Sequence, residues 1–142
     1  MFTDGGARGN PGPAAAGVHL KIDDREINLG AYLGETTNNQ AEYEALRLGL
    51  KKVAELVDPT VVEEFQIYMD SELVVKQVCG EYRVKNPAIK RYWESLQPLM
   101  RQYPMIELQY VPRQKNKIAD ALVNQVLDAQ NGVKDTTTTS SV

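Results

Sequence analysis

The amino-acid sequence predicts an α/β fold, layered in the manner of α+β proteins, in which helices pack on a mixed β-sheet. Two patterns support this prediction: strand-like segments separated by turn residues dominate the first 36 residues, and helical and strand-like segments alternate after them. A length of 142 residues suits one domain. We assign residues 1–129 to this domain and residues 130–142 to a disordered tail.

The first three strands are predicted from apolar segments bounded by turn residues. A short strand ends at Asp4, and residues 5–13 (GGARGNPGP) have turn composition throughout. Residues 15–22 and 26–33 predict two more strands, with Asp23-Asp24 as the turn between them. We therefore expect an antiparallel meander with an unusually long glycine-rich connection.

A long helix is predicted next, ending near Val57 ahead of Pro59. Thr37 and Gln40 fit a capping box at its start, and Asn38 is an alternative cap. Apolar residues recur at helical spacing on its inner face. They are Ala45, Leu46, Gly49, Val53 and Val57.

The second half of the chain predicts strands and helices in turn. The expected elements are strand 65–69, helix 72–78, helix 86–101, strand 106–110 and helix 117–129. Ser71 can cap the first of these helices and Gly80 can end it. Pro87 suits the first turn of the second helix.

Composition excludes several kinds of site. The single cysteine, Cys79, leaves no internal disulfide and no cysteine-based zinc site, and the single histidine, His19, leaves no HExxH motif. We find no apolar run long enough to span a membrane and no signal-peptide pattern. We therefore expect a cytoplasmic protein that does not bind a membrane. A monomer is a separate expectation.

Charge is distributed unevenly along the chain, although the formal net charge is only −3. Residues 1–75 carry a net charge of −7, whereas residues 76–117, the basic segment, carry +6. This asymmetry is consistent with a metal site beside a track for a polyanion. Scattered charge on a solvated surface is the alternative.

Four carboxylates occupy unexpected positions: Asp4, Glu42, Asp70 and Asp120. Asp4 and Asp70 end strands, Glu42 lies on the apolar stripe of the long helix, and Asp120 opens the last helix. Each has a local explanation. Asp4 could be a turn residue and Asp70 a helix cap. Glu42 could compensate the helix dipole, and Asp120 could be ordinary first-turn charge. If the four converge at one sheet edge, their repulsion requires a divalent metal, and hard oxygen ligands favour Mg²⁺ or Mn²⁺.

The blocks around these carboxylates resemble type 1 ribonuclease H, the family of endonucleases that cut the RNA strand of an RNA–DNA hybrid. The matching residues are Phe2-Thr3-Asp4-Gly5, Gly9-Asn10-Pro11-Gly12, Thr37-Asn38-Asn39 with Glu42, Asp70-Ser71, and Ala119-Asp120-Ala121-Leu122 with Asn124. The resemblance is closest to the compact prokaryotic branch. It implies a five-stranded mixed sheet of order 3-2-1-4-5 with helices on both faces.

The resemblance also implies roles for individual residues. Asp4, Glu42, Asp70 and Asp120 would hold two Mg²⁺ ions, with Mn²⁺ as a substitute, and the products would carry 5′-phosphate and 3′-hydroxyl ends. The implied hybrid contacts are Gly5, Gly6, Asn10, Thr37, Asn38, Asn39 and Asn124. Helix capping is the alternative role of Thr37 and Asn38.

The basic segment is a candidate track for the hybrid. The residues proposed for this track are Tyr82, Arg83, Lys85, Lys90, Arg91, Tyr92 and Trp93. Phosphate contacts here would make binding salt-dependent. For the last two aromatic residues, a place in the core is the alternative.

The sequence departs from the family pattern at three places. It lacks the basic helical protrusion of many relatives, Glu72 replaces a common glutamine, and Arg113 stands where many relatives carry a catalytic-loop histidine. Because arginine stays protonated near pH 7, Arg113 would act electrostatically, without transferring a proton. A non-catalytic hybrid-binding module and a nuclease for DNA junctions or single strands are the competing hypotheses.

Overall fold

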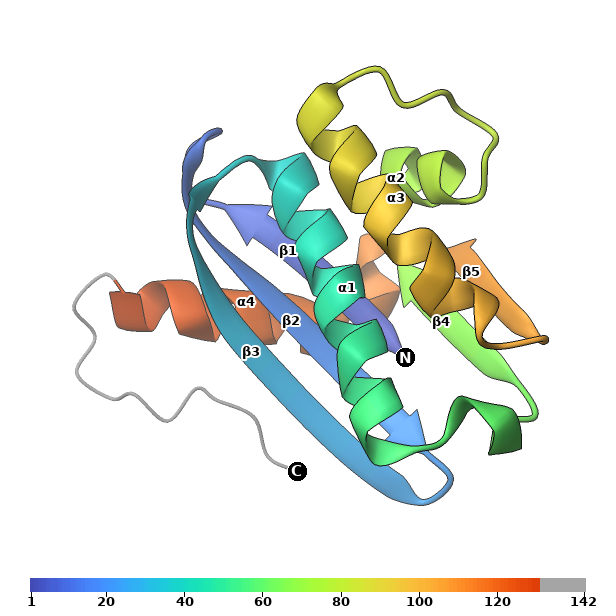
Figure 1. Cartoon of the computed structure of the whole chain (residues 1–142). Helices are drawn as coiled ribbons and strands as arrows, with labels where there is room; N and C mark the ends of the chain where they lie inside the picture. Colours follow the sequence, from blue (N-terminus) through green and yellow to red (C-terminus); the bar gives the residue numbers. More distant parts are fainter. Residues whose placement is uncertain (131–142) are drawn as a thin grey trace.

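The computed structural model describes residues 1–130, which form one five-stranded sheet with helices on both faces (Figure 1). The strands lie in the order β3-β2-β1-β4-β5, as the resemblance implies. They are β1 (Phe2–Ala7), β2 (Gly12–Ile22), β3 (Arg25–Thr36), β4 (Phe65–Met69) and β5 (Ile106–Tyr110). The first three strands are antiparallel, and β4 and β5 run parallel to β1.

The glycine-rich connection is shorter than its composition predicts. Strand β1 continues to Ala7 and β2 begins at Gly12, because Gly5, Gly6 and Ala7 pair with residues 14–16 of β2. Asp4 therefore lies inside β1 and not at its end. The prediction of turn structure over all of residues 5–13 is wrong, since the pairing holds residues of turn composition in an extended conformation.

Four α-helices lie within the described residues. They are α1 (Asn38–Leu56), α2 (Glu72–Val78), α3 (Pro87–Arg101) and α4 (Lys117–Gln130). Their bounds agree with the predicted helices to within two residues. Gln130 ends α4, so the tail predicted for 130–142 begins in a helix and otherwise lies outside the described residues. None of these helices has the length and apolar character needed to cross a membrane.

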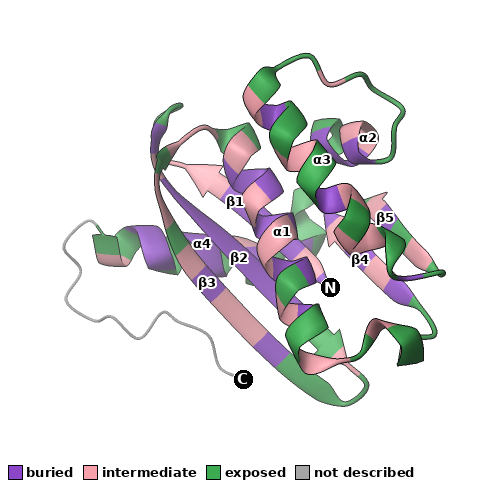
Figure 2. Cartoon of the chain, viewed as in Figure 1, coloured by how far each residue is buried: buried purple, intermediate pink, exposed green. Residues whose placement is uncertain are grey.

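Buried residues lie on the strands and on the helices that cover them (Figure 2), and apolar clusters fill both faces of the sheet. On one face, α1, α2 and α3 cover a large core that includes Leu46, Ile67 and Leu96. On the other face, α4 packs on β1, β2 and β3 through a smaller cluster that includes Val123 and Leu127. Burial on both faces holds β1 rigidly in the middle of the molecule.

The topology brings several element ends to one edge of the sheet. The carboxyl-terminal halves of the parallel strands β1 and β4 point to the same edge as the first turn of α1. The loop between β5 and α4 contains a short 3-10 turn, Arg113–Lys115, and reaches this edge from the other side. Side chains at these ends can therefore gather in one place.

Candidate active site

Three of the predicted carboxylates lie together at this edge. Asp4 of β1, Glu42 of α1 and Asp70, which follows β4, each offer an oxygen within 4.8 Å of the others. Asp4 and Glu42 are buried, and Asp70 is partly exposed. Each belongs to a different element, so the cluster depends on how β1, β4 and α1 pack.

Glu42 is held in place by the backbone of β1. The Gly5 N–H donates a 2.9 Å hydrogen bond to Glu42 Oε1. A Cβ at Gly5 would lie 2.2 Å from the carbonyl carbon of Ala41, so α1 can approach β1 this closely only because Gly5 lacks a side chain. Burial, followed by the charges of Asp4 and Asp70, raises the pKa of Glu42 well above its usual range.

Asp4 lies in the centre of the acidic group. Burial raises its pKa to about 8, and the neighbouring charges of Asp70 and Asp120 add to this effect. Arg113 opposes the shift. Burial also raises the pKa of Asp70. This electrostatic arrangement favours either protonation or a bound cation.

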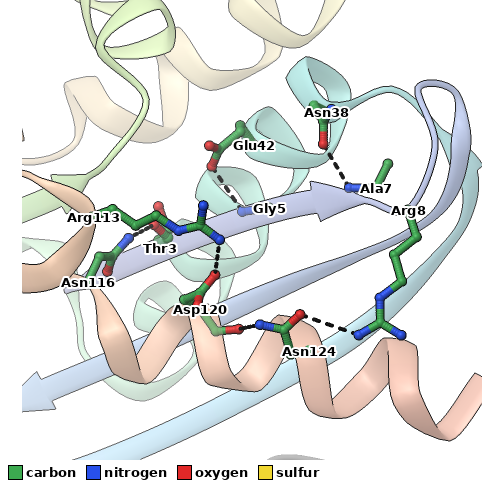
Figure 3. A network of polar contacts seen from close by, with 10 residues as sticks. All are labelled: Thr3, Gly5, Ala7, Arg8, Asn38, Glu42, Arg113, Asn116, Asp120 and Asn124. Carbon is green, nitrogen blue, oxygen red and sulfur yellow. Dashed lines mark hydrogen bonds and ion pairs between the residues drawn. The ribbon is translucent and has the colours of Figure 1, made fainter.

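Asn116 links the β5–α4 loop to β1 and has no predicted role. It is only 1% exposed, and its Nδ2 donates a 2.9 Å hydrogen bond to the backbone oxygen of Thr3 (Figure 3). It also hydrogen-bonds to Asp70 and thereby works against the rise in that pKa. A single asparagine in a polar loop gave no sequence signal for this link.

The fourth carboxylate, Asp120, stands beside the trio in the first turn of α4. Its Oδ1 lies 3.4 Å from Nη2 of Arg113, whose side chain is 78% exposed. Arg113 thus faces the acidic group at the position predicted for a substitute of the loop histidine. Its charge lowers the pKa values of both Asp4 and Asp70.

The carboxylates open into a cavity of about 370 Å³. Its charged lining consists of Asp4, Glu42, Asp70, Asp120, Arg8 and Arg113. The backbone of residues 5–7 forms another part of the wall. A Cβ at Gly6 would meet only Val123 Cγ1, at 3.7 Å, so packing does not require a glycine there. The absence of a side chain at Gly6 instead leaves more space in the cavity.

Two of the predicted asparagines link α1 to β1 and to the glycine-rich loop, which is the connection between β1 and β2 at residues 8–11. Asn38 Oδ1 accepts from the Ala7 N–H at 2.9 Å, and Asn10 Oδ1 accepts from the Asn38 N–H at 3.0 Å. Thr37 is the N-cap of α1 and forms the predicted capping box with Gln40. Asn39 is exposed beside them. Both anchored asparagines use their oxygens here, so their amide N–H groups are the donors left for a ligand.

Asn124 lies one turn after Asp120 on α4, as predicted. Its Nδ2 donates to the backbone oxygen of Asp120 at 3.2 Å, and its Oδ1 accepts from Arg8 Nη2 at 3.4 Å (Figure 3). Arg8 in turn pairs with Asp128 at 2.7 Å. Arg8 was not among the predicted site residues, because its place in a glycine-rich turn gave no indication of what it would face.

The basic segment divides into exposed and packed residues. Tyr82, Arg83, Lys85, Lys90 and Arg91 are exposed. Trp93 donates from Nε1 to the Gln77 backbone oxygen at 2.9 Å, and Tyr92 packs near Tyr43. Both aromatic residues pack against the core, as the alternative predicted. Glu72 of α2, which replaces a glutamine common in the family, is exposed and pairs with Lys76 at 3.6 Å.

The donor set suits a hard divalent cation. Carboxylate oxygens of three residues share one cavity, and burial, with the charges of acidic neighbours, raises all three of their pKa values. A bound cation would compensate this concentration of negative charge, and oxygen ligands without sulfur or imidazole fit Mg²⁺ or Mn²⁺. The residues present therefore fit the metal that the resemblance implies.

Comparison with known proteins agrees with this architecture. A family described as reverse transcriptase-like matches residues 2–126. LC11-RNase H1, crystallised in complex with an RNA/DNA hybrid, is 42% identical with a TM-score of 0.84, over 91% of this chain and 96% of that chain. Sheet order and helix placement thus define a ribonuclease H-like fold.

Two further relatives narrow the assignment. RNase H1 from the archaeon Halobacterium salinarum is 37% identical with a TM-score of 0.81, over 90% of this chain and 96% of that chain. A bifunctional protein of Mycobacterium tuberculosis is 39% identical over 129 residues, which are 89% of this chain but 34% of that protein. The chain belongs to the type 1 ribonuclease H family, and it spans about a third of the length of its mycobacterial relatives.

Proposed function

We propose that this protein is an endonuclease that hydrolyses the RNA strand of RNA–DNA hybrids and leaves 5′-phosphate and 3′-hydroxyl ends. The observation that carries the proposal is the buried carboxylate cluster at the sheet edge of a ribonuclease H fold. A relative of the same fold was crystallised with an RNA/DNA hybrid, which supports the substrate. The family resemblance supports the product ends.

Asp4, Glu42, Asp70 and Asp120 are the proposed ligands of two Mg²⁺ ions, for which Mn²⁺ could substitute. When bound, such ions would supply charge stabilisation at the scissile phosphate and lower the pKa of the attacking water. The chain's own contribution is to hold four carboxylates from four elements against their mutual repulsion. Gly5 and Asn116 do this by fixing Glu42 and the β5–α4 loop to β1.

Arg113 is the proposed electrostatic residue of the site. Its guanidinium faces Asp120 and lowers the pKa values of Asp4 and Asp70, so it favours the ionised carboxylates. Its exposed position lets it also meet a phosphate of the substrate or product. A guanidinium stays charged near pH 7, so this role requires no proton transfer.

Recognition of the hybrid is assigned to the glycine-rich loop and the start of α1. The amide groups of Asn10, Asn38 and Asn39 can donate to sugar hydroxyls, bases or phosphates, and among these groups the 2′-hydroxyl distinguishes RNA from DNA. Thr37 adds a hydroxyl at the same helix terminus, where an anionic phosphate is favoured. Gly5 and Gly6 provide a wall without side chains along which the strand can lie close to the carboxylates.

The exposed cations of the basic segment extend this surface toward α3. Arg91 lines a 440 Å³ hollow between α1 and α3 together with Gln40, which lies in the first turn of α1. We propose that the hybrid continues from the carboxylates across this hollow. A monomeric, cytoplasmic protein remains our expectation.

The decisive experiment is cleavage of a labelled RNA–DNA hybrid with Mg²⁺ or Mn²⁺, compared with duplex DNA, duplex RNA and single strands. We expect cuts within the RNA strand of the hybrid alone, and mapping of the fragment ends should show 5′-phosphates. Absence of cleavage by folded protein with either metal would exclude the proposed activity. Cleavage of junctions or single strands instead would favour the alternative nuclease.

A single-residue variant assigns the activity to the proposed site. Asp70→Asn should abolish cleavage, by roughly 10³-fold or more, because it removes a ligand charge without changing side-chain shape. Hybrid binding should persist, and circular dichroism should show an unchanged fold. Asp24→Asn makes the same chemical change in the exposed turn between β2 and β3 and should leave the rate unaltered. Turnover retained by Asp70→Asn would remove Asp70 from this role.

A further inference from the structure

Arg8 is a cation in the active-site cavity that the proposed chemistry does not use. It lies in the connection between β1 and β2 and lines the same cavity as the four carboxylates. Its Nη2 donates to Asp128 Oδ1 at 2.7 Å and to Asn124 Oδ1 at 3.4 Å. Both partners lie on α4, so Arg8 bridges the glycine-rich loop and this helix.

Arg8 and Arg113 lie at opposite ends of a polar line along α4 (Figure 3). Arg113 pairs with Asp120, Asn124 follows one turn later, and Arg8 contacts Asn124 from the other end. One turn of α-helix rises about 5.4 Å, a length comparable with the step between neighbouring phosphates of a nucleic acid strand. Both guanidinium groups line the cavity that holds the acidic cluster, so they add positive charge where a polyanion would approach.

In the ion pair between Arg8 and Asp128, a phosphate can replace the Asp128 carboxylate. The side chains are 37% and 55% exposed, so water screens their attraction and the pair adds little to stability. A phosphate offers the same guanidinium two oxygens in a fork geometry. Asn124 can keep its contact with Arg8 during such an exchange, because it holds the guanidinium through a separate oxygen.

We propose that Arg8 binds a backbone phosphate of the RNA strand next to the scissile phosphate. In the free enzyme, Asp128 pairs with the Arg8 guanidinium in place of this phosphate. Asn124 then acts as a positioning residue, since both ends of its amide are used within the protein. Arg8 and Arg113 then contact the strand at the two ends of the polar line along α4. This inference rests on the proposed function, because it requires an RNA strand in the cavity.

The test measures binding of a fluorescent RNA–DNA hybrid by anisotropy, in Mg²⁺, over a range of salt concentrations. All variants carry Asp70→Asn so that the hybrid stays intact. The set comprises Arg8→Ala, Asp128→Asn and the two combined. Arg25→Ala, at the start of β3, removes the same charge away from the cavity and is the control.

Arg8→Ala should weaken binding roughly 5- to 10-fold and reduce the slope of log affinity against log salt by about 0.9, as expected for one lost phosphate contact. Asp128→Asn should tighten binding roughly 2- to 5-fold, because it removes the competitor of the phosphate. The gain should disappear when Arg8→Ala is also present. Arg25→Ala should change neither quantity.

Two results would overturn the proposal. One is a salt slope and affinity for Arg8→Ala equal to those of the Arg25→Ala control. The other is an Asp128→Asn gain that persists undiminished without Arg8, since the effect would then be general electrostatics. Thermal unfolding of each variant checks the fold. If Arg8→Ala is unstable, an Asp128→Asn variant that binds no more tightly than its Asp70→Asn parent would contradict the proposal by itself. Cleavage by the wild type is measured in parallel, so failure of the proposed function is seen separately.

Discussion

Asp4 is buried among like charges, and its ionisation opposes folding when no cation is bound. Its pKa is about 8 in the folded protein against an ordinary value near 3.8. The folded state therefore holds a proton that the unfolded state releases. The stability that this proton provides is complete below about pH 4 and is lost as the pH rises toward 8.

We expect Asp4→Asn to stabilise the metal-free protein at pH 8 by about 1–3 kcal/mol and to have little effect at pH 4. Unfolding in denaturant at both pH values, in a chelator, measures the difference. All other titrating groups are present in both proteins, so the difference reports Asp4 together with its effect on Glu42 and Asp70. In saturating Mg²⁺ the wild type should regain stability and the variant less so. An equal effect of the substitution at both pH values would contradict the assigned pKa.

Arg113 places a positive charge beside Asp120, and this charge persists at neutral pH. Arg113→Ala should lower kcat roughly 10- to 100-fold, because it removes an electrostatic partner of the reacting groups. Arg113→Lys should recover part of the rate, because lysine keeps the positive charge and loses only the bidentate hydrogen bonding of the guanidinium.

The pH–rate profile separates this role from proton transfer. Both limbs of the Arg113→Ala profile should persist with a reduced height, and the acidic limb should move to higher pH, because Asp4 and Asp70 lose a charge that lowers their pKa values. A limb that disappears in the variant would contradict a purely electrostatic role for Arg113. A wild-type rate for Arg113→Ala would remove it from the site.

At the scale of elements, the contact between β1 and α1 sets the position of Glu42. Gly5 and Gly6 are neighbours in sequence but do different things. A Cβ at Gly5 would lie 2.2 Å from the backbone of Ala41, whereas one at Gly6 makes an ordinary contact with Val123. The first glycine therefore serves packing and the second leaves space in the cavity.

Gly5→Ala should destabilise the protein by about 3 kcal/mol or more and abolish cleavage, because α1 must move away from β1 and carry Glu42 with it. Gly6→Ala is the matched control for the fold: its stability should stay within about 0.5–1 kcal/mol of wild type. Its hybrid affinity should fall, since the methyl group enters the wall of the cavity. Denaturant unfolding and hybrid binding measure the two effects, and equal destabilisation by both substitutions would contradict the packing argument.

At the scale of the whole molecule, the net charge of −3 hides two opposed regions. Four of the acidic residues gather at the cavity, where bound cations would offset them, and exposed lysines and arginines lie on and near α3. A polyanion can therefore approach this protein despite its net negative charge. Binding should be salt-sensitive and should strengthen with metal.

The double variant Lys90→Ala and Arg91→Ala tests the path over α3. We expect hybrid affinity to fall and the salt slope to decrease by about 1–2, with kcat at saturating hybrid nearly unchanged. Arg25→Ala with Lys51→Ala removes two exposed charges elsewhere and should leave the slope as it is. A double variant with wild-type affinity and slope would place the hybrid on another surface.

The sequence alone identifies most elements and the residue types of the site. Periodicity places the helices within two residues of their bounds, because each helix repeats its apolar face locally. The glycine-rich loop was mispredicted, since turn composition does not reveal that β2 pairs with residues 5–7. Capping by Thr37 was predictable, because it involves only Gln40, three residues away.

Tertiary structure alone decides which side chains meet. Asn116 bonds to Thr3 across 113 positions, and Arg8 pairs with Asp128 across 120. Neither contact has a local signature, because each arises from packing α4 and its loop against β1. The sequence by itself specifies four carboxylates on separate elements and an arginine in place of a histidine. Only the packed sheet brings Asp4, Glu42 and Asp70 within 4.8 Å, and burial at that edge gives Asp4 its raised pKa.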